Sequence, residues 1–158
     1  MIKLQARAET LYDTDYCLWL EQNIRFLQSR QFGALDLINL IEELSELGKR
    51  DRRKLKNLLR QLLQHLLKLR YWQAEYENNQ AHWRAEITNF RSQIRDELMD
   101  SPSLRPYLMD TFAECYADAR ELASVRSQLP IDTFPEIPMA DLNQVMDKHW
   151  WPCSTDPD

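Results

Sequence analysis

The amino-acid sequence predicts an all-α protein, a mainly antiparallel bundle of four to five helices with a proline-rich C-terminal strap. Three observations lead to this fold class. Only 2 of the 158 residues are glycine, although hairpins and phosphate-binding loops depend on that residue. Leu, Glu, Arg and Gln, which favour helices, are abundant, and apolar residues recur at spacings of three and four. Five of the 7 prolines follow Gln128, which predicts an extended end to the chain.

Capping residues define the first two expected helices. Asp13 or Thr14 can cap a helix that reaches about residue 30. Asp36 can cap a second helix, and Gly48 stands where a left-handed residue would end it. The sequence therefore predicts a turn at Gly48 between an acidic helix and a basic one.

The expected third helix, from about residue 51 to residue 76, is the most apolar. Its leucines and Trp72 cover an arc of about 220 degrees at 100 degrees per residue, which is too broad for one partner helix. We therefore expect this helix to be central. Further helices are predicted over residues 81–100 and 103–127, with one short helix near 139–147 in the strap, where Trp150 or Trp151 should pack on the bundle.

The predicted domain organisation is a single helical domain. It comprises an N-terminal arm over residues 1–12, the bundle over 13–127 and the strap over 128–158. No apolar run approaches the length of a membrane span, and no signal peptide is recognisable at the start. We therefore expect a soluble, cytoplasmic protein. The 3 cysteines form no CxxC pair, and Cys17 and Cys115 are expected to be buried.

Charge is unevenly distributed along the chain. The net charge is -5 overall but +6 over residues 49–60. Four of these basic residues share one helix face and are candidates for contact with a partner or a nucleic acid: Lys49, Arg53, Lys56 and Arg60. A simpler interpretation, which we favour, pairs the basic residues with Glu42, Glu43 and Glu46 across the Gly48 turn.

Candidate metal ligands are few. Glu43, Glu46 and His65 could meet across the expected hairpin, but no histidine follows a Glu-x-x-His pattern. A histidine at the edge of an apolar arc is more often a hydrogen-bonded core residue. The sequence favours no metal site and no cofactor.

Catalytic motifs are also missing from the sequence. Neither Cys17 nor Cys115 lies in a nucleophile motif, and two isolated glycines allow no P-loop and no GxGxxG loop. We therefore expect no nucleotide, and the sequence does not favour an enzyme.

The chain resembles a known family in several ordered motifs. These are YDTDYCLWLEQNIRFLQSRQFGALDLINLIEELSELGKRDRRKLKNLLRQLLQHLLKLRYW, SPSLRPYL, YADARELA and the closing LP, TFP and WP, which together extend from about Leu11 to Pro152. This set is similar to the family named domain of unknown function twenty-nine, small proteins found mainly in photosynthetic bacteria. The resemblance implies an all-helical single domain and no assigned activity or catalytic residue.

A non-enzymatic, cytoplasmic interaction or regulatory module is the function that the sequence favours. A protein partner or self-association is expected in preference to nucleic acid, and no membrane partner is expected. Two alternatives remain open at this point. One is a nucleic-acid-binding regulator that uses the basic helix face, and the other is a metal-dependent enzyme with a Glu/His site.

Overall fold

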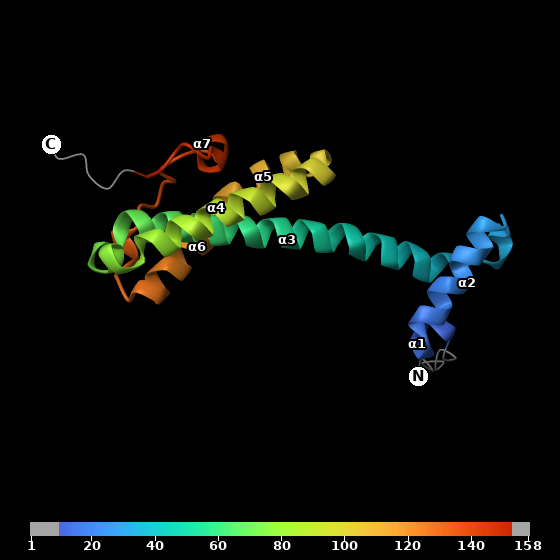
Figure 1. The fold of residues 1–158 in the computed structure, drawn as a ribbon. Coiled ribbons are helices and arrows are strands. Elements are labelled where there is room, and N and C mark those ends of the chain that lie inside the picture. The colour runs from blue at the N-terminus through green and yellow to red at the C-terminus, as the bar shows by residue number, and fades with distance from the viewer. Residues whose placement is uncertain (1–9, 153–158) are drawn as a thin grey trace. The chain divides into compact units, whose positions relative to one another are not determined.

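The computed structural model describes residues 10–152, and this range is all-α, as predicted; it contains seven α-helices and no strand. Four short 3-10 turns join the helices (Figure 1): Phe32–Ala34, Gln73–Glu75, Pro102–Leu104 and Ile131–Thr133. None of the described helices is long and apolar enough to cross a membrane. The chain divides into two compact units, Met1–Lys49 and Arg50–Asp158. The expected single domain remains a prediction, and most of its N-terminal arm, residues 1–9, lies outside the described residues.

The first unit contains α1 (Leu11–Thr14), α2 (Tyr16–Gln28) and the start of α3. Both short-range caps come from aspartates. The Asp13 carboxylate accepts the Thr10 backbone N–H at 3.0 Å, and the Asp15 carboxylate accepts that of Leu18 at 3.0 Å. Such caps satisfy N–H groups that a first helical turn leaves without partners.

The helix α3 extends from Leu37 to Tyr71 without interruption, so the predicted turn at Gly48 is wrong. Gly48 does not have a positive φ, and a Cβ built on it would meet nothing within 4 Å. One glycine costs a helix interior only about 1 kcal/mol, which the neighbouring helix formers offset. The two helices expected on either side of Gly48 are therefore one.

The second unit packs around the C-terminal half of α3, as the broad apolar arc predicted. Every residue from Leu62 to Leu69 is buried. Around it lie α4 (Tyr76–Asp100), α5 (Arg105–Asp110) and α6 (Phe112–Ser127), which contribute Trp83, Ile87, Leu108 and Ala119 to the same core (Figure 1). The helix predicted over residues 103–127 is divided at Thr111 into α5 and α6.

The proline-rich strap crosses this core and includes the predicted short helix, α7 (Leu142–Met146). Prolines remove backbone donors, so the carbonyls of the strap need side-chain partners. Tyr116 donates to the Pro135 carbonyl at 2.7 Å, and Arg91 donates to the carbonyls of Val145 and Trp150 at 2.7 and 2.8 Å. Trp150 and Trp151 pack on the bundle, as expected.

Candidate functional site in the basic segment of α3

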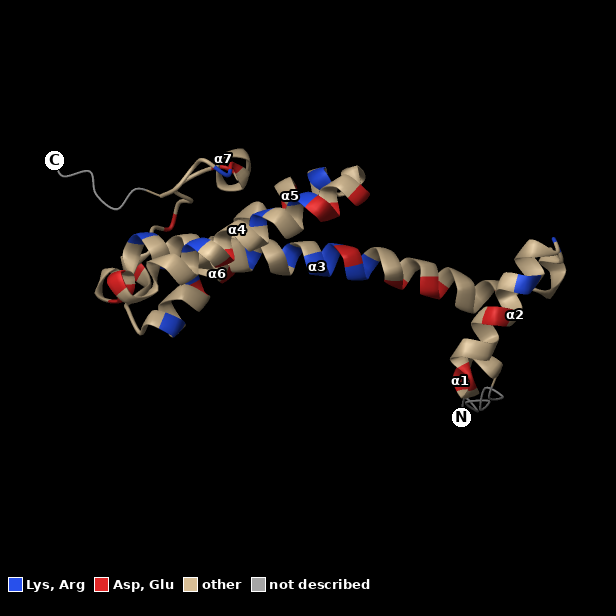
Figure 2. Ribbon diagram, in the orientation of Figure 1, with Lys and Arg blue, Asp and Glu red and all other residues tan. Residues whose placement is uncertain are grey.

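The basic segment, residues 49–60, lies along the middle of α3 (Figure 2). It carries seven cations: Lys49, Arg50, Arg52, Arg53, Lys54, Lys56 and Arg60. The four predicted contact residues lie in different units and have different neighbours. Lys49 belongs to the first unit, where it donates to Glu46 at 2.7 Å, and the other three belong to the second.

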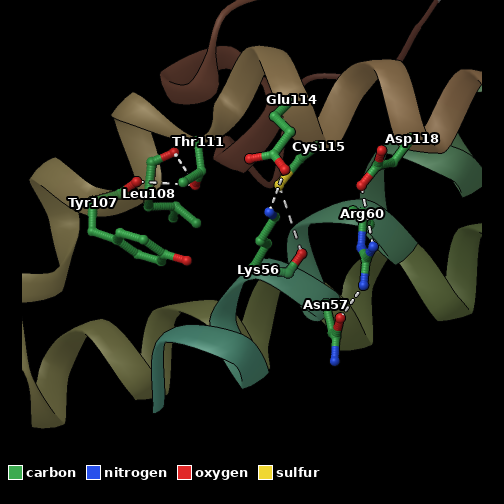
Figure 3. Close-up of polar contacts among 9 residues, drawn as sticks. All are labelled: Lys56, Asn57, Arg60, Tyr107, Leu108, Thr111, Glu114, Cys115 and Asp118. Atoms are coloured by element: carbon green, nitrogen blue, oxygen red, sulfur yellow. Dashed lines mark hydrogen bonds and ion pairs between the residues drawn. The ribbon is translucent and has the colours of Figure 1, made fainter. Parts of the chain in front are cut away.

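Lys56 and Arg60 are held by two carboxylates of α6 (Figure 3). Lys56 Nζ lies 2.6 Å from Glu114 Oε1, and Arg60 Nη1 lies 3.1 Å from Asp118 Oδ2. The two cations are four residues apart on α3 and the two carboxylates are four residues apart on α6, so one turn of α3 pairs with one turn of α6. The carboxylate of Glu114 raises the pKa of Lys56 above its ordinary value. These two cations therefore connect α3 to α6.

The predicted partners of the basic residues were only partly correct. Intramolecular pairing occurs, but Lys56 and Arg60 pair with α6 and not with the acidic residues before Gly48. Glu43 instead accepts hydrogen bonds from Tyr12 at 2.6 Å and Tyr16 at 3.0 Å. The bond to Glu43 raises the pKa of Tyr12 to about 12. The error follows from the missing turn, which would have folded the segment back on its acidic neighbour.

Another part of the basic segment lines an open hollow of about 550 Å³. Its walls are formed by α3 and α4, with three cations, three amide side chains and one leucine: Arg50, Arg53, Lys54, Asn57, Leu58, Gln61 and Gln93. The Lys54 ammonium also contacts the Glu97 carboxylate of α4, which raises the pKa of Lys54. Arg53 is thus the one predicted contact residue that lines this hollow.

Cys115 lies beside the Lys56–Glu114 pair and is fully buried, as expected (Figure 3). Its thiol is 3.8 Å from the Lys56 carbonyl oxygen, and burial raises its pKa above the ordinary value. A raised pKa lowers the thiolate fraction, which is the reactive form. Cys17, by contrast, is exposed on α2, so its expected burial is wrong.

A row of polar side chains is buried where α3 passes between its neighbours. Gln64 is fully buried, and neither its amide nitrogen nor its amide oxygen has a hydrogen-bond partner among the described residues. His65 packs against Phe90 with its ring centroid 5.3 Å away, and burial lowers its pKa to about 4. Lys68 lies 5.5 Å from the Trp83 ring centroid, and burial lowers its pKa to about 8.

The three weak metal candidates are not brought together. Glu43 is engaged by two tyrosines, Glu46 by Lys49, and His65 by the Gln61 carbonyl 2.8 Å from its Nδ1. Within residues 10–152, no group of three His, Cys, Asp or Glu side chains could hold a metal ion. The sequence prediction had relied on a hairpin at Gly48, which does not form.

A hydrogen-bonded joint in the first unit was not foreseen. Trp19 Nε1 donates to Asp36 at 2.9 Å, Asn39 donates to the same carboxylate at 2.6 Å, and Asn23 accepts the Asp36 backbone N–H at 3.0 Å. Among residues 10–49, the buried ones are Trp19, Asn23 and Asn39. The signal available in the sequence was two asparagines on otherwise amphipathic helices, where polar residues are normally exposed.

Because these polar residues occupy the inside of the hairpin, its apolar residues point outward. Along α2, Tyr16 donates to Glu43 and the later Trp19 donates to the earlier Asp36, so α2 and the start of α3 run in opposite directions. At 100 degrees per residue, the apolar residues lie about 90 degrees past the joint on α2 and about 140 degrees past it on α3. Because the two helices are antiparallel, the same sense of rotation turns both sets toward one side of the hairpin. We name this surface the hairpin face; its residues are Leu20, Ile24, Leu27, Leu37, Ile41 and Leu44.

The fold therefore defines an all-α protein with two parts. One is a helical hairpin held by hydrogen bonds, and the other is a helical core packed through apolar side chains. The chain belongs to the family described as "Domain of unknown function DUF29", whose model matches residues 11–151. Comparison with curated proteins and comparison with solved structures gave no significant match. The family resemblance of the sequence is confirmed, and it assigns no biochemical role.

Proposed function

We propose that the protein is a non-enzymatic interaction module that pairs with a second copy of itself through the hairpin face. The observation that carries the proposal is the exposure of large apolar side chains on α2 and α3. Leu44 is 66% exposed, Ile41 63% and Leu37 56%. Soluble monomers rarely expose contiguous apolar patches, and those that do mostly use them as interaction sites.

The size of the first unit favours a second copy as the partner. Its described part has 40 residues, 10–49, and Trp19 is the one apolar side chain buried within that part. Helical pairs of this size lack a core of their own and are usually stabilised by disulfides, metals or oligomerisation. Two hairpin faces paired about a two-fold axis would form a four-helix bundle with leucine and isoleucine inside.

The two alternatives remain predictions of lesser support. A nucleic-acid-binding regulator would need the face of Lys49, Arg53, Lys56 and Arg60. Yet Lys49, Lys56 and Arg60 pair with carboxylates, and Arg53 also takes part in an interaction within the chain. A metal-dependent enzyme built on Glu43, Glu46 and His65 has no geometric support. The cytoplasmic location also remains a prediction.

The test compares the solution mass of the wild-type full chain with that of a variant that carries two added charges in the hairpin face. The double variant Ile41→Glu/Leu44→Glu changes exposed positions, so it should fold with unchanged helicity. Light scattering should give a dimer for the wild type and a monomer for this variant, because like charges would be buried at the interface.

The matched control is Val125→Glu, which places a charge at a 75% exposed apolar position on α6, outside the hairpin face. It should leave the dimer intact. A wild type that is strictly monomeric at high micromolar concentration would refute the proposal, as would a double variant that still dimerises.

A further inference from the structure

The hollow between α3 and α4 has a composition that the hairpin face does not share. Three of its seven lining residues are cations and three are primary amides, with no carboxylate among them. Leu58, which is nearly buried, lies among these polar side chains. Guanidinium, ammonium and amide groups all supply N–H donors, so this lining suits an anion with several acceptor oxygens.

The donors are ordered along the helix. Arg50, Arg53 and Lys54 come first, Asn57 one turn later and Gln61 one turn beyond that. At a rise of 1.5 Å per residue, the row from residue 50 to residue 61 is about 16 Å long. The Asn57 oxygen already accepts from Arg60, so its amide nitrogen is the group left to donate, and it points away from Arg60 (Figure 3).

Nearby cations of the same helix are used differently. Lys56 and Arg60 are fastened to Glu114 and Asp118 on α6, which removes them from the hollow. Arg50 has no ion pair among residues 10–152. Lys54 contacts the Glu97 carboxylate, and the charges of Asp51 and Asp100 also raise the pKa of Lys54. The charge of Arg50 is therefore not neutralised by an ion pair within the described residues, in a chain whose net charge is -5.

We propose that this hollow binds the phosphate group of a small phosphorylated compound, with Arg50, Arg53 and Lys54 around the phosphate and Asn57, Gln61 and Gln93 hydrogen-bonding the remainder. A volume of about 550 Å³ is within the range of small-molecule sites. A small ligand is favoured over a nucleic acid because the row of donors ends within one hollow. Beyond it, the acidic residues of α6 would repel a long phosphate backbone.

Glu97 has a specific place in this proposal. Its carboxylate competes with the ligand for the Lys54 ammonium, so binding must displace or share that contact. Removing the carboxylate should therefore strengthen binding, whereas removing a lining cation should weaken it. The two substitutions should therefore change the binding affinity in opposite directions, which a general change in stability would not do.

The first measurement is calorimetric titration of the full chain with inorganic pyrophosphate at low ionic strength. Arg50→Gln should weaken binding about tenfold, because one charge-assisted contact to phosphate is lost. Arg52→Gln is the matched control, since Arg52 precedes Arg53 on the same helix but lies over the Tyr107 ring, outside the hollow. It should weaken binding clearly less than Arg50→Gln does, because Arg52 supplies only long-range attraction and no direct contact to the phosphate.

The second measurement compares two glutamates of α4. Glu97→Gln should tighten pyrophosphate binding about threefold or more by releasing Lys54, a gain of the size expected for an exposed pair. Glu77→Gln makes the same change in net charge near the other end of α4 and should have almost no effect. Gln93→Glu, which adds a carboxylate to the hollow, should weaken binding and does not depend on any α3 variant.

Absence of pyrophosphate binding to the wild type at millimolar concentration would overturn the proposal. Equal effects of Arg50→Gln and Arg52→Gln would do so as well, because they would indicate a diffuse field and not a site. Tighter binding of a short DNA duplex than of pyrophosphate, lost in Arg50→Gln, would replace the small ligand with a nucleic acid. Dimerisation through the hairpin face is read by light scattering, so failure of either proposal can be recognised separately.

Discussion

Protonation of His65 should make the second unit sensitive to mild acid. Nδ1 lies 2.8 Å from the Gln61 carbonyl, which can only accept, so Nδ1 carries the proton of the neutral ring. Burial is the main cause that lowers the pKa of His65 from 6.5 to about 4, and the Lys68 and Arg126 charges act in the same direction. The carbonyl of Gln61 and the carboxylate of Glu86 oppose them.

The sign of the effect follows from proton binding in the two states. Below pH 6.5 the unfolded chain protonates His65 while the folded chain does not, so the free energy of unfolding falls as the pH falls toward 4. For these two pKa values the loss is about 2 kcal/mol at pH 5 and about 3 kcal/mol at pH 4, relative to neutral pH. The loss levels off only well below the folded-state pKa, where His65 is protonated in both states.

Urea unfolding followed by circular dichroism, at pH 7 and pH 5, measures this loss. His65→Leu places an apolar side chain where His65 is only 7% exposed, next to Leu62 and Leu66, so it should fold. From pH 7 to pH 5, the free energy of unfolding should fall in both proteins, but the fall should be about 2 kcal/mol smaller in His65→Leu than in the wild type. His82→Leu, at an exposed position on α4, is the matched control and should keep the pH dependence of the wild type.

Identical pH dependence in His65→Leu and the wild type would refute this reasoning. A direct check is the NMR titration of the His65 ring, whose midpoint should lie well below that of a free histidine. A midpoint near 6.5 would mean that the ring is hydrated in the folded protein.

Three further predictions concern single residues. Gly48→Ala should stabilise α3 by about 1 kcal/mol and slow amide exchange around residue 48 about fivefold, because the added methyl has open space and glycine is a poor helix former. Lys68→Met should stabilise the second unit by about 2–3 kcal/mol at pH 7, since burial lowers the pKa of Lys68 to about 8. Wild-type stability should then rise between pH 8 and pH 10.5, where the unfolded chain binds the extra proton, and denaturant unfolding of the variant should show no such rise. Arg91→Leu should cost about 2–4 kcal/mol and speed proteolysis of the strap, because the carbonyls of Val145 and Trp150 lose their donor; unchanged proteolysis would contradict this role.

Periodicity predicted the second unit well. The arc of leucines on α3 requires neighbours on several sides, and α4, α6 and the strap provide them. The end of α6 was also predictable, because the prolines begin just after it; in the structure, Gln128 ends the helix in a left-handed conformation. These features depend on apolar spacing and on proline, which act over short distances along the chain.

Features that depend on long-range polar contacts were predicted less well. Gly48 resembles a helix end, but whether the chain turns there depends on whether folding back would bury enough apolar surface. Pairing of Lys56 with Glu114, 58 residues later in the chain, has no local signature, so the expected partners were the nearest acidic residues. The joint around Asp36 was invisible for the same reason, although Asp36 itself was correctly identified as the residue that caps the helix.

The residues that hold the joint are separate from the residues of the hairpin face, so the face can change in evolution while the joint is kept. The angle between α2 and α3 is held by Trp19, Asn23, Asp36 and Asn39, and none of these belongs to the face. In the dimer that we propose, substitutions among the exposed leucines and isoleucines would therefore change the paired surface while the hairpin keeps its geometry. Relatives that differ only in those exposed residues could form mutually exclusive pairs on one unchanged scaffold.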